Sequence, residues 1–297
     1  MTILTKLWLY RRHCSNSFLP SPITLSSNTM RNSFIYTILG TALLLGTACE
    51  KEITPDLGGN DSRYVVEGVL TDEAGGCSVK ISRTKDFYSD NSFDGVSGAI
   101  VKIYHGTDTT VLAETSTGVY TAPELTGSSG NTYGMTVNIA GEVITATSIM
   151  PSKVNMDSLY ITKEEVFGDT QNQPTVQFQD PAGVANYYRF TLYVNDYKST
   201  NIYVRNDDLT DGNLVNANLF SFDSEEGDPD YVDSGDQITV EMMNIDPFVY
   251  KYFFSLSQSA TGENQSASPA NPVSNLKGNA LGYFSAHTIQ RKTITVP

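Results

Sequence analysis

The sequence predicts a mainly β protein, and three of its features point to this fold class. Short runs in which apolar and polar residues alternate recur from residue 64 onward. Clusters of Gly, Ser, Asn and Asp, which favour turns, separate these runs. No long helical period interrupts the regularly spaced strand patterns, and one helical pattern stands out, near residue 250. Many short strands without intervening helices favour an antiparallel sandwich, followed here by a second β-rich domain that carries one amphipathic helix.

The chain opens with a segment that has the layout of a bacterial lipoprotein signal. Arg31 precedes the apolar residues 34–45, and the small residues 46–48 precede Cys49. This apolar run is shorter than the roughly 17–25 residues that a spanning helix needs. We therefore expect cleavage before Cys49, whose thiol carries a diacylglyceryl anchor. A cleaved secretory peptide without lipidation is the alternative, because Gly46 stands where such sites more often carry Leu.

The leader also sets the expected division of the chain. A signal that starts at Met1 exceeds the roughly 15–30 residues that are typical, whereas one that starts at Met30 fits this length. We expect residues 1–29 to be an over-extended gene start, residues 30–48 the signal peptide and residues 49–61 a lipidated tether. Residues 62–150 are the predicted sandwich domain. Residues 151–297 are the predicted second β-rich domain.

Composition excludes some partners. The leader holds four of the 19 basic residues and none of the 33 acidic ones, which leaves the remainder with a net charge of −18. Such a field repels nucleic acid, and no polybasic segment offers a phosphate site, so we expect no nucleic-acid partner. Once Cys49 is acylated, Cys77 is the one cysteine left after the leader. The domains must then rely on hydrophobic cores in place of an intrachain disulfide.

Strand patterns follow one another through both domains. In the first domain the clearest is 133–139, with apolar residues at every second position. The other runs there are 64–70, 78–82, 99–104, 111–115 and 143–149. In the second domain we expect strands at 156–161, 175–178, 187–194, 201–204, 237–244 and 292–296, and an extended loop at 262–278.

Residues 247–260 are expected to form the helix. Asp246 is a good N-cap, Pro247 suits the first helical position, and Gly262 can close the C-terminus. An apolar stripe wide enough to cover a sheet face runs along one side, formed by Phe248, Tyr252 and Leu256 with Val249 and Phe253 beside them.

An acidic excursion over residues 206–236, expected to be loop, holds ten carboxylates and no basic residue. Asp207, Asp208 and Asp211 are calcium candidates because calcium prefers carboxylate oxygens, although an EF-hand register fails here. The alternative is a solvated loop. Its embedded apolar residues indicate that it packs on its own sandwich or on a partner.

Aromatic residues provide further binding candidates for glycans or proteins. These are Tyr187, Tyr193, Tyr203, Phe220 and Phe222. The alternative reading is that strand alternation buries half of the tyrosines whatever the function.

Catalytic signals are weak. The two histidines after the leader, His105 and His287, have no metal-ligand spacing. Residues 95–99 (GVSGA) miss the Gly-x-Ser-x-Gly nucleophile motif and precede a strand, whereas that motif needs a helix. We therefore expect no enzyme, no resident metal and no cofactor.

An ordered set of motifs resembles one family, the domain of unknown function 4249 family of bacterial surface lipoproteins. The resemblance covers most of residues 49–297. It rests on Cys49 and the segments 64–70 (YVVEGVL), 96–103 (VSGAIVKI), 118–120 (GVY), 186–190 (NYYRF), 206–212 (NDDLTDG), 248–256, 272–276 (PVSNL) and 278–284 (GNALGYF). The sequence departs from the family at 278–280, where a denser glycine cluster is usual.

The resemblance implies an outer-membrane protein, since the genes of this family often lie near TonB-dependent transporters. It also makes the first half similar to carboxypeptidase-regulatory or transthyretin-like sandwiches, which speaks to fold alone. Glu50 and Glu52, directly after Cys49, are of the kind that directs lipoproteins to the cell surface.

Three function classes follow from these observations. The leading expectation is a non-enzymatic outer-membrane lipoprotein that binds a ligand or partner as an accessory of a TonB-dependent uptake system. A surface adhesin or glycan-binding sandwich is the alternative. A calcium-dependent hydrolase would need a carboxylate site within 206–236.

Overall fold

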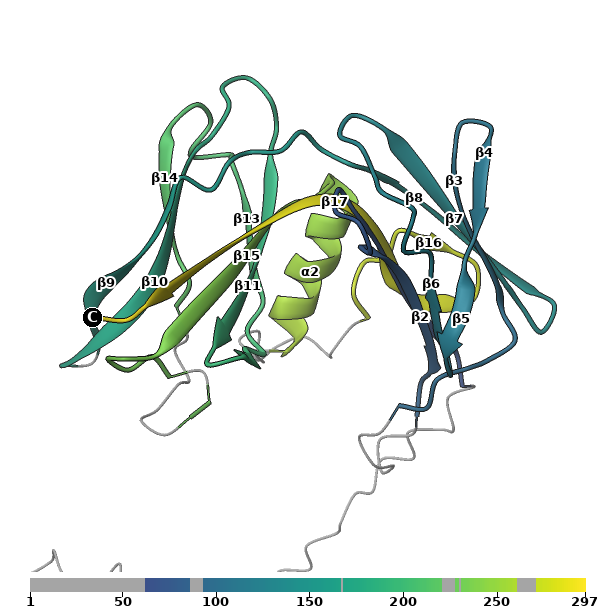
Figure 1. The fold of residues 1–297 in the computed structure, drawn as a ribbon, viewed down its shortest axis with the longest axis horizontal. Coiled ribbons are helices and arrows are strands. Elements are labelled where there is room, and N and C mark those ends of the chain that lie inside the picture. The colour runs from purple at the N-terminus through teal and green to yellow at the C-terminus, as the bar shows by residue number, and fades with distance from the viewer. Residues whose placement is uncertain (1–61, 86–92, 167, 221–227, 230, 261–270) are drawn as a thin grey trace, which may run out of the picture. The chain divides into compact units, whose positions relative to one another are not determined.

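A computed structural model describes residues 62–85, 93–166, 168–220, 228–229, 231–260 and 271–297. These residues belong to one compact unit, 59–297. The signal peptide, Cys49, the tether and Phe222 lie outside the described residues. Within them the protein is mainly β with one helix, α2, as predicted (Figure 1).

A nine-stranded sheet runs through the whole unit. Eight strands follow one another in the order β12 (Tyr197–Lys198), β11 (Tyr187–Val194), β15 (Gln237–Asn244), β17 (Ala280–Thr295), β1 (Tyr64–Thr71), β2 (Cys77–Arg83), β6 (Val119–Thr121) and β5 (Ala113–Ser116). The ninth strand, β13 (Tyr203–Asn206), pairs with β11. The pair β1–β17 is parallel, so the sheet is mixed. Its parallel pair joins the first described strand to the last.

Two smaller sheets are antiparallel. The five-stranded sheet has the order β16 (Leu276–Lys277), β8 (Glu142–Ile149), β7 (Thr132–Ile139), β3 (Ile100–His105) and β4 (Asp108–Val111). The three-stranded sheet has the order β14 (Leu214–Asn218), β10 (Asp169–Gln179) and β9 (Ser158–Val166).

The side-chain alternation of β17 defines the layers. Phe284 and Ala286 enter the core beneath the five-stranded sheet, whereas Ile294 and Val296 pack in the core beneath the three-stranded sheet. Because these residues are an even number of positions apart, both small sheets cover the same face of the large sheet. Ile289, an odd number of positions from these residues, packs with Val249 and Phe253 of α2 on the opposite face. Figure 1 shows α2 beside the large sheet.

The link between the two sandwiches is fastened to the large sheet. Asn244 Oδ1 accepts a hydrogen bond from Val154 N at 3.0 Å. The Gln290 side chain donates to Val154 O at 2.5 Å and accepts from Met156 N at 2.8 Å. The domain boundary at residue 150 stays a prediction about folding units. The structure adds that β17 contributes to both cores and holds the link.

The late motifs of the sequence close the first sandwich. The Asn275 side chain donates to Thr147 O at 3.1 Å and to Phe284 O at 2.7 Å, and it accepts from Phe284 N at 3.0 Å. It therefore bridges β8 and β17 as a strand would. A Cβ on Gly282, whose φ is +107°, would lie 2.0 Å from Val66 O, so only glycine lets β17 approach β1 here.

Three expected elements differ in the structure. The run 111–115 is two strands, because the chain passes from the five-stranded to the large sheet at the buried Leu112. The acidic excursion 206–236 is not all loop, since β14 pairs with β10. The expected loop 262–278 contains β16, whose backbone completes the edge of β8. Alternation of apolar and polar residues predicts a strand, but it does not indicate which sheet the strand joins or where the chain passes from one sheet to another.

The helix α2 (Pro247–Ala260) has the bounds that its cap predicted. Asp246 Oδ1 accepts from Phe248 N at 2.8 Å and Val249 N at 2.9 Å. The predicted stripe is wrong at Phe248, which is exposed, because Val249 and Phe253 face the sheet. No helix among the described residues has the length and apolar character to cross a bilayer.

Candidate functional site

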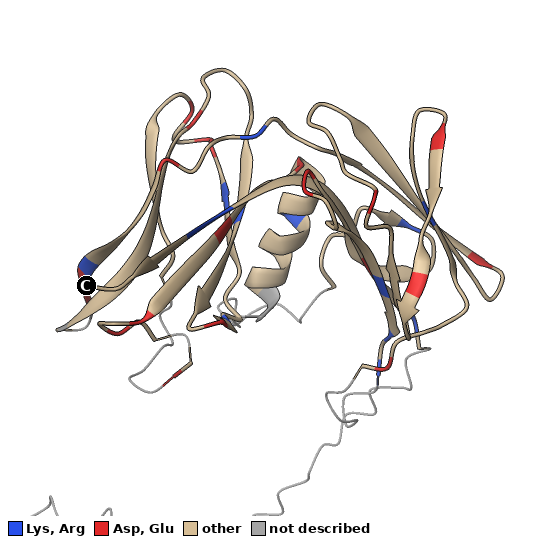
Figure 2. Ribbon diagram, viewed as in Figure 1, with Lys and Arg blue, Asp and Glu red and all other residues tan. Residues whose placement is uncertain are grey.

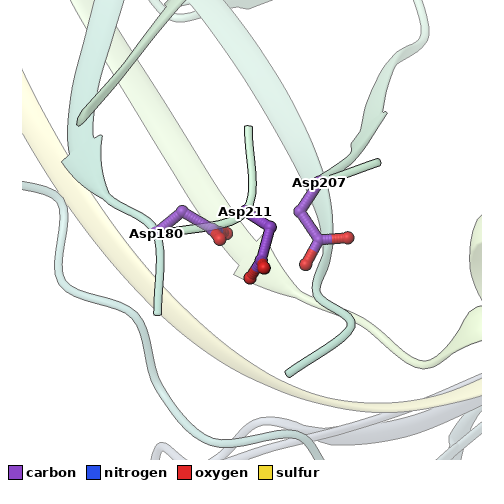
Figure 3. Close-up of side chains that lie close together, drawn as sticks. All are labelled: Asp180, Asp207 and Asp211. Atoms are coloured by element: carbon purple, nitrogen blue, oxygen red, sulfur yellow. The ribbon is translucent and has the colours of Figure 1, made fainter. Parts of the chain in front are cut away.

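Three carboxylates meet at one end of the second sandwich. Asp180 follows β10, while Asp207 and Asp211 follow β13. One oxygen of each lies within 4.8 Å of the other two, and Figure 3 shows the three side chains converging. The loops involved are residues 180–186 and 207–213, and we call this region the acidic end. Figure 2 shows acidic residues in both loops.

Backbone amides hold two of the carboxylates across the loops. Asp207 Oδ2 accepts from Asn186 N at 2.7 Å, and Asp211 Oδ1 accepts from Gly183 N at 2.7 Å. In both bonds an amide of the first loop donates to a carboxylate of the second loop. The acidic residues therefore fasten the two loops together.

Asp180 is bound from two sides. Its Oδ2 accepts from Gly212 N at 3.2 Å, and its Oδ1 accepts from the Tyr188 hydroxyl. A Cβ on Gly212, whose φ is +70°, would lie 2.8 Å from the Ala182 Cβ, so the loops meet closely only with glycine there. Burial raises the pKa of Tyr188, and the hydrogen bond to Asp180 and the charges of Asp180 and Asp207 raise it further.

The cluster gathers negative charge without a basic partner. Asp180 and Asp207 are buried and Asp211 is exposed. None of the ion pairs within the described part of the chain involves these side chains. Carboxylate oxygens at this spacing are ligands that calcium prefers. Asp180, Asp207 and Asp211 could thus hold a cation, and calcium binding stays a prediction.

The structure changes the membership of the predicted set. Asp207 and Asp211 come together as expected, but Asp208 accepts from Asn206 Nδ2 at 2.5 Å and is not among the three. Asp180 takes that place. No local pattern in the sequence could identify Asp180, because the pairing of β10 with β14 brings it beside residues far along the chain.

Exposed apolar residues accompany the cluster. Leu209 is 95% exposed, Val184 59% and Leu214 54%. The first two lie in the loops that the carboxylates fasten, and Leu214 begins β14. The acidic end thus combines fixed backbone, negative charge and accessible apolar side chains.

A cavity of about 210 Å³ lies between β13 and β14. Its lining is made of Phe190, residues 202–205 and residues 217–219. A smaller, adjoining cavity shares Tyr203 and Leu219 and extends to Phe220 and Tyr231. Two of the predicted aromatic candidates, Tyr203 and Phe220, therefore line cavities on the open side of the second sandwich.

The other aromatic candidates lie elsewhere. Tyr187 contacts Tyr250 of α2 with ring centroids 5.1 Å apart, and Tyr250 stacks on Phe254 at 5.7 Å. Tyr193 donates to Glu241 Oε2 at 3.2 Å. No local pattern groups Tyr250 and Phe254 with the strand tyrosines, because their proximity depends on how α2 packs against the sheet.

Three potentially catalytic side chains, Ser285, His287 and Cys77, are sequestered. Ser285 Oγ lies 2.8 Å from His287 Nδ1, but both residues are buried. Burial lowers the pKa of His287 to about 4, helped by the charge of Arg189. Cys77 is buried, and burial raises the pKa of its thiol to about 11. A substrate has no access to these groups, and a neutral thiol is a poor nucleophile.

The fold is that of a mainly β protein with a carboxylate cluster at one end of its second sandwich. The chain belongs to the family described as Domain of unknown function (DUF4249), whose model matches residues 50–293. This confirms the family that the motifs resemble. No curated protein matches the chain. Lipidation and the likeness to transthyretin-type sandwiches stay predictions.

Proposed function

We propose that this protein is a non-enzymatic lipoprotein of the outer membrane, held by a lipid on Cys49, that binds a TonB-dependent transporter through its acidic end. The leader sequence supports the anchor. Family membership supports the general class, although it assigns no activity.

The observation that carries the partner-binding role is the exposure of Leu209, Val184 and Leu214 at the acidic end. Leu209 lies on a loop that hydrogen bonds from Asn186, Gly183 and Gly212 hold in place, so the loop presents this side chain to solvent. Apolar side chains presented on a rigid, polar-rimmed surface are typical of protein interfaces. The surrounding carboxylates would select a partner surface of positive charge.

The strand registers support the orientation that this role needs. They place Tyr188, which binds Asp180, level with Asn244 of β15 and Thr288 of β17. Thr288 is the residue after His287, which pairs with Thr71 at the end of β1. Tyr64, at the start of β1, pairs with Ala280, which is eight residues from Thr288, about 26 Å at 3.3 Å per residue. A chain attached through its N-terminal segment would present the acidic end away from that attachment.

The non-enzymatic assignment is supported by chemistry. Catalysis in water needs a group with a tuned pKa that can reach a substrate. In the described residues Cys77, Ser285 and His287 are all buried. A binding role makes no such demand.

Co-purification from native outer membranes tests the partner. The wild-type chain should retain a TonB-dependent barrel in mild detergent, and the double variant Val184→Asp/Leu209→Asp should retain at least tenfold less. Val111→Asp/Val143→Asp is the matched control, because these residues are 60% and 57% exposed on the five-stranded sheet. Absence of a barrel with the wild type, or equal loss with both variants, would contradict the proposal.

The anchor is tested separately by mass spectrometry of the N-terminal peptide from producing cells. We expect a peptide that begins at Cys49 and carries acyl chains. Cys49→Ala should abolish acylation and release the protein from membranes. An unmodified first residue or an intact leader in the wild type would refute the anchor.

A further inference from the structure

We propose that the free edge of β14 receives an extended peptide strand of the partner, with one apolar side chain in the cavity beside it and a carboxylate paired with Arg205. This inference rests on the proposed function, since the partner supplies the strand. It places a second contact next to the acidic end.

The register shows which backbone groups are available on β14. Asp180 N donates to Asn213 O at 3.0 Å, and Leu219 N donates to Pro174 O at 2.9 Å. Antiparallel pairing alternates bonded and non-bonded positions, so residues 213, 215, 217 and 219 face β10. The amides and carbonyls of residues 214, 216 and 218 therefore point to the open edge, where the described strands provide no partner. Such an edge is a template for an added strand.

The cavity lies where side chains of an added strand would point. Ala217 and Leu219 line it on the β14 side, and Phe190 and Tyr203 line it on the side of the large sheet. Its volume is about 210 Å³ and it opens to the protein surface, so a side chain of an added strand can enter it. A leucine or phenylalanine side chain would replace this space with van der Waals contacts.

Arg205 supplies the charge preference. It lies on the cavity wall and is half-buried. Within the described part of the chain its guanidinium makes no hydrogen bond, ion pair or ring contact. An arginine with free donors beside an open edge matches a carboxylate, which it can bind in a bidentate manner.

A peptide strand fits this site better than a second copy of the chain. Pairing β14 with β14 of another copy would bring two Arg205 side chains to one interface. It would also join two chains that each carry a large negative charge. A strand of another protein with an acidic residue would pair with the edge amides, place an apolar side chain in the cavity and bind the guanidinium of Arg205.

A panel of nine-residue peptides of alternating threonine and valine tests the site. The central, inward-facing residue is alanine, valine, leucine or phenylalanine. The residue two positions along, which faces the same side, is glutamate or lysine. Hydrogen–deuterium exchange of the full chain in detergent should show protection of residues 214–218 with the leucine or phenylalanine peptides. Fluorescence anisotropy should give at least tenfold weaker binding for the lysine versions.

Two pairs of variants separate edge binding from folding. Asn216→Pro removes an outward N–H without removing a bond to β10, and should abolish peptide binding. Asn216→Thr loses the same side-chain bonds to Tyr160 and Gln177 but keeps the N–H, and should bind normally. Arg205→Glu should reverse the preference so that lysine peptides bind better, whereas Arg205→Gln should abolish the preference.

The outcomes distinguish this proposal from the proposed function. No protection with any peptide at millimolar concentration, or equal binding by Asn216→Pro and Asn216→Thr, overturns the edge site. Dimerisation that Asn216→Pro abolishes would assign the edge to a second copy and also overturns it. If Asn216→Pro loses the peptide but keeps the transporter, the transporter contact lies elsewhere and the strand proposal fails alone. If peptides bind but no transporter co-purifies, the proposed function fails and the edge site remains.

Discussion

His287 lies in the middle of β17, buried beside Ser285, and its protonation opposes folding. Burial and Arg189 lower its pKa to about 4, while the charge of Asp72 acts in the other direction. The ordinary value is near 6.5, so the unfolded chain takes up the proton first as the pH falls. The stabilisation is therefore complete above pH 6.5 and is lost on acidification toward pH 4.

The free energy of unfolding should fall across this interval by up to about 3 kcal/mol from His287 alone, at 1.36 kcal/mol per pKa unit. Urea titrations at pH 4, 5, 6 and 7 measure it. His287→Gln should flatten the profile, whereas His105→Gln in an exposed turn should not. An unchanged slope with His287→Gln would show that other groups dominate.

Asp246 shows how one residue joins an element to the rest of the fold. Besides capping α2, its carboxylate accepts from the Ser148 hydroxyl on β8, which in turn accepts from Ala286 N at 2.9 Å. Burial raises the pKa of Asp246, although these hydrogen bonds act to lower it. The helix N-terminus, β8 and β17 are thus connected through one carboxylate.

Replacing this cap should cost more than a surface cap, which contributes about 1 kcal/mol. Asp246→Ala leaves buried donors without acceptors, so we expect a loss of about 2–4 kcal/mol in the free energy of unfolding. Asp246→Asn keeps one oxygen and should lose less. Denaturant unfolding followed by circular dichroism measures both. A loss below about 0.5 kcal/mol for Asp246→Ala would contradict the role of the network.

The elements that the sequence predicted best are those with local chemistry. The helix followed from Asp246 and Pro247, and most strands followed from alternation, because both signals lie within a few residues. Phe248 was wrongly assigned to the buried stripe, because α2 is oriented so that Val249 and Phe253 pack against Met243 and Ile289. That orientation is a tertiary effect.

The candidate site was predicted only in part, for the same reason. Asp207 and Asp211 stand close in sequence, so their proximity was accessible. Asp180 lies beside them because strand pairing brings distant segments together. Arg205 lines a cavity that forms only where two separate sheets meet. Neither long-range relation leaves a pattern in a single sequence.

At the scale of the whole molecule, the large sheet makes the two sandwiches interdependent. Residues 62–150 lack Phe284 and Ala286 from their core and the parallel partner of β1. Expressed alone, they should show no cooperative thermal transition by calorimetry, whereas residues 49–297 should unfold in one transition. A fragment 62–150 that melts cooperatively near the temperature of the full chain would establish an independent domain.

The position of β17 has a consequence for biosynthesis. Because this strand completes both hydrophobic cores and follows every other described strand in the sequence, a nascent chain cannot finish either core until residues 280–296 are synthesised. A premature stop before β17 would therefore leave two open cores and a substrate for proteases.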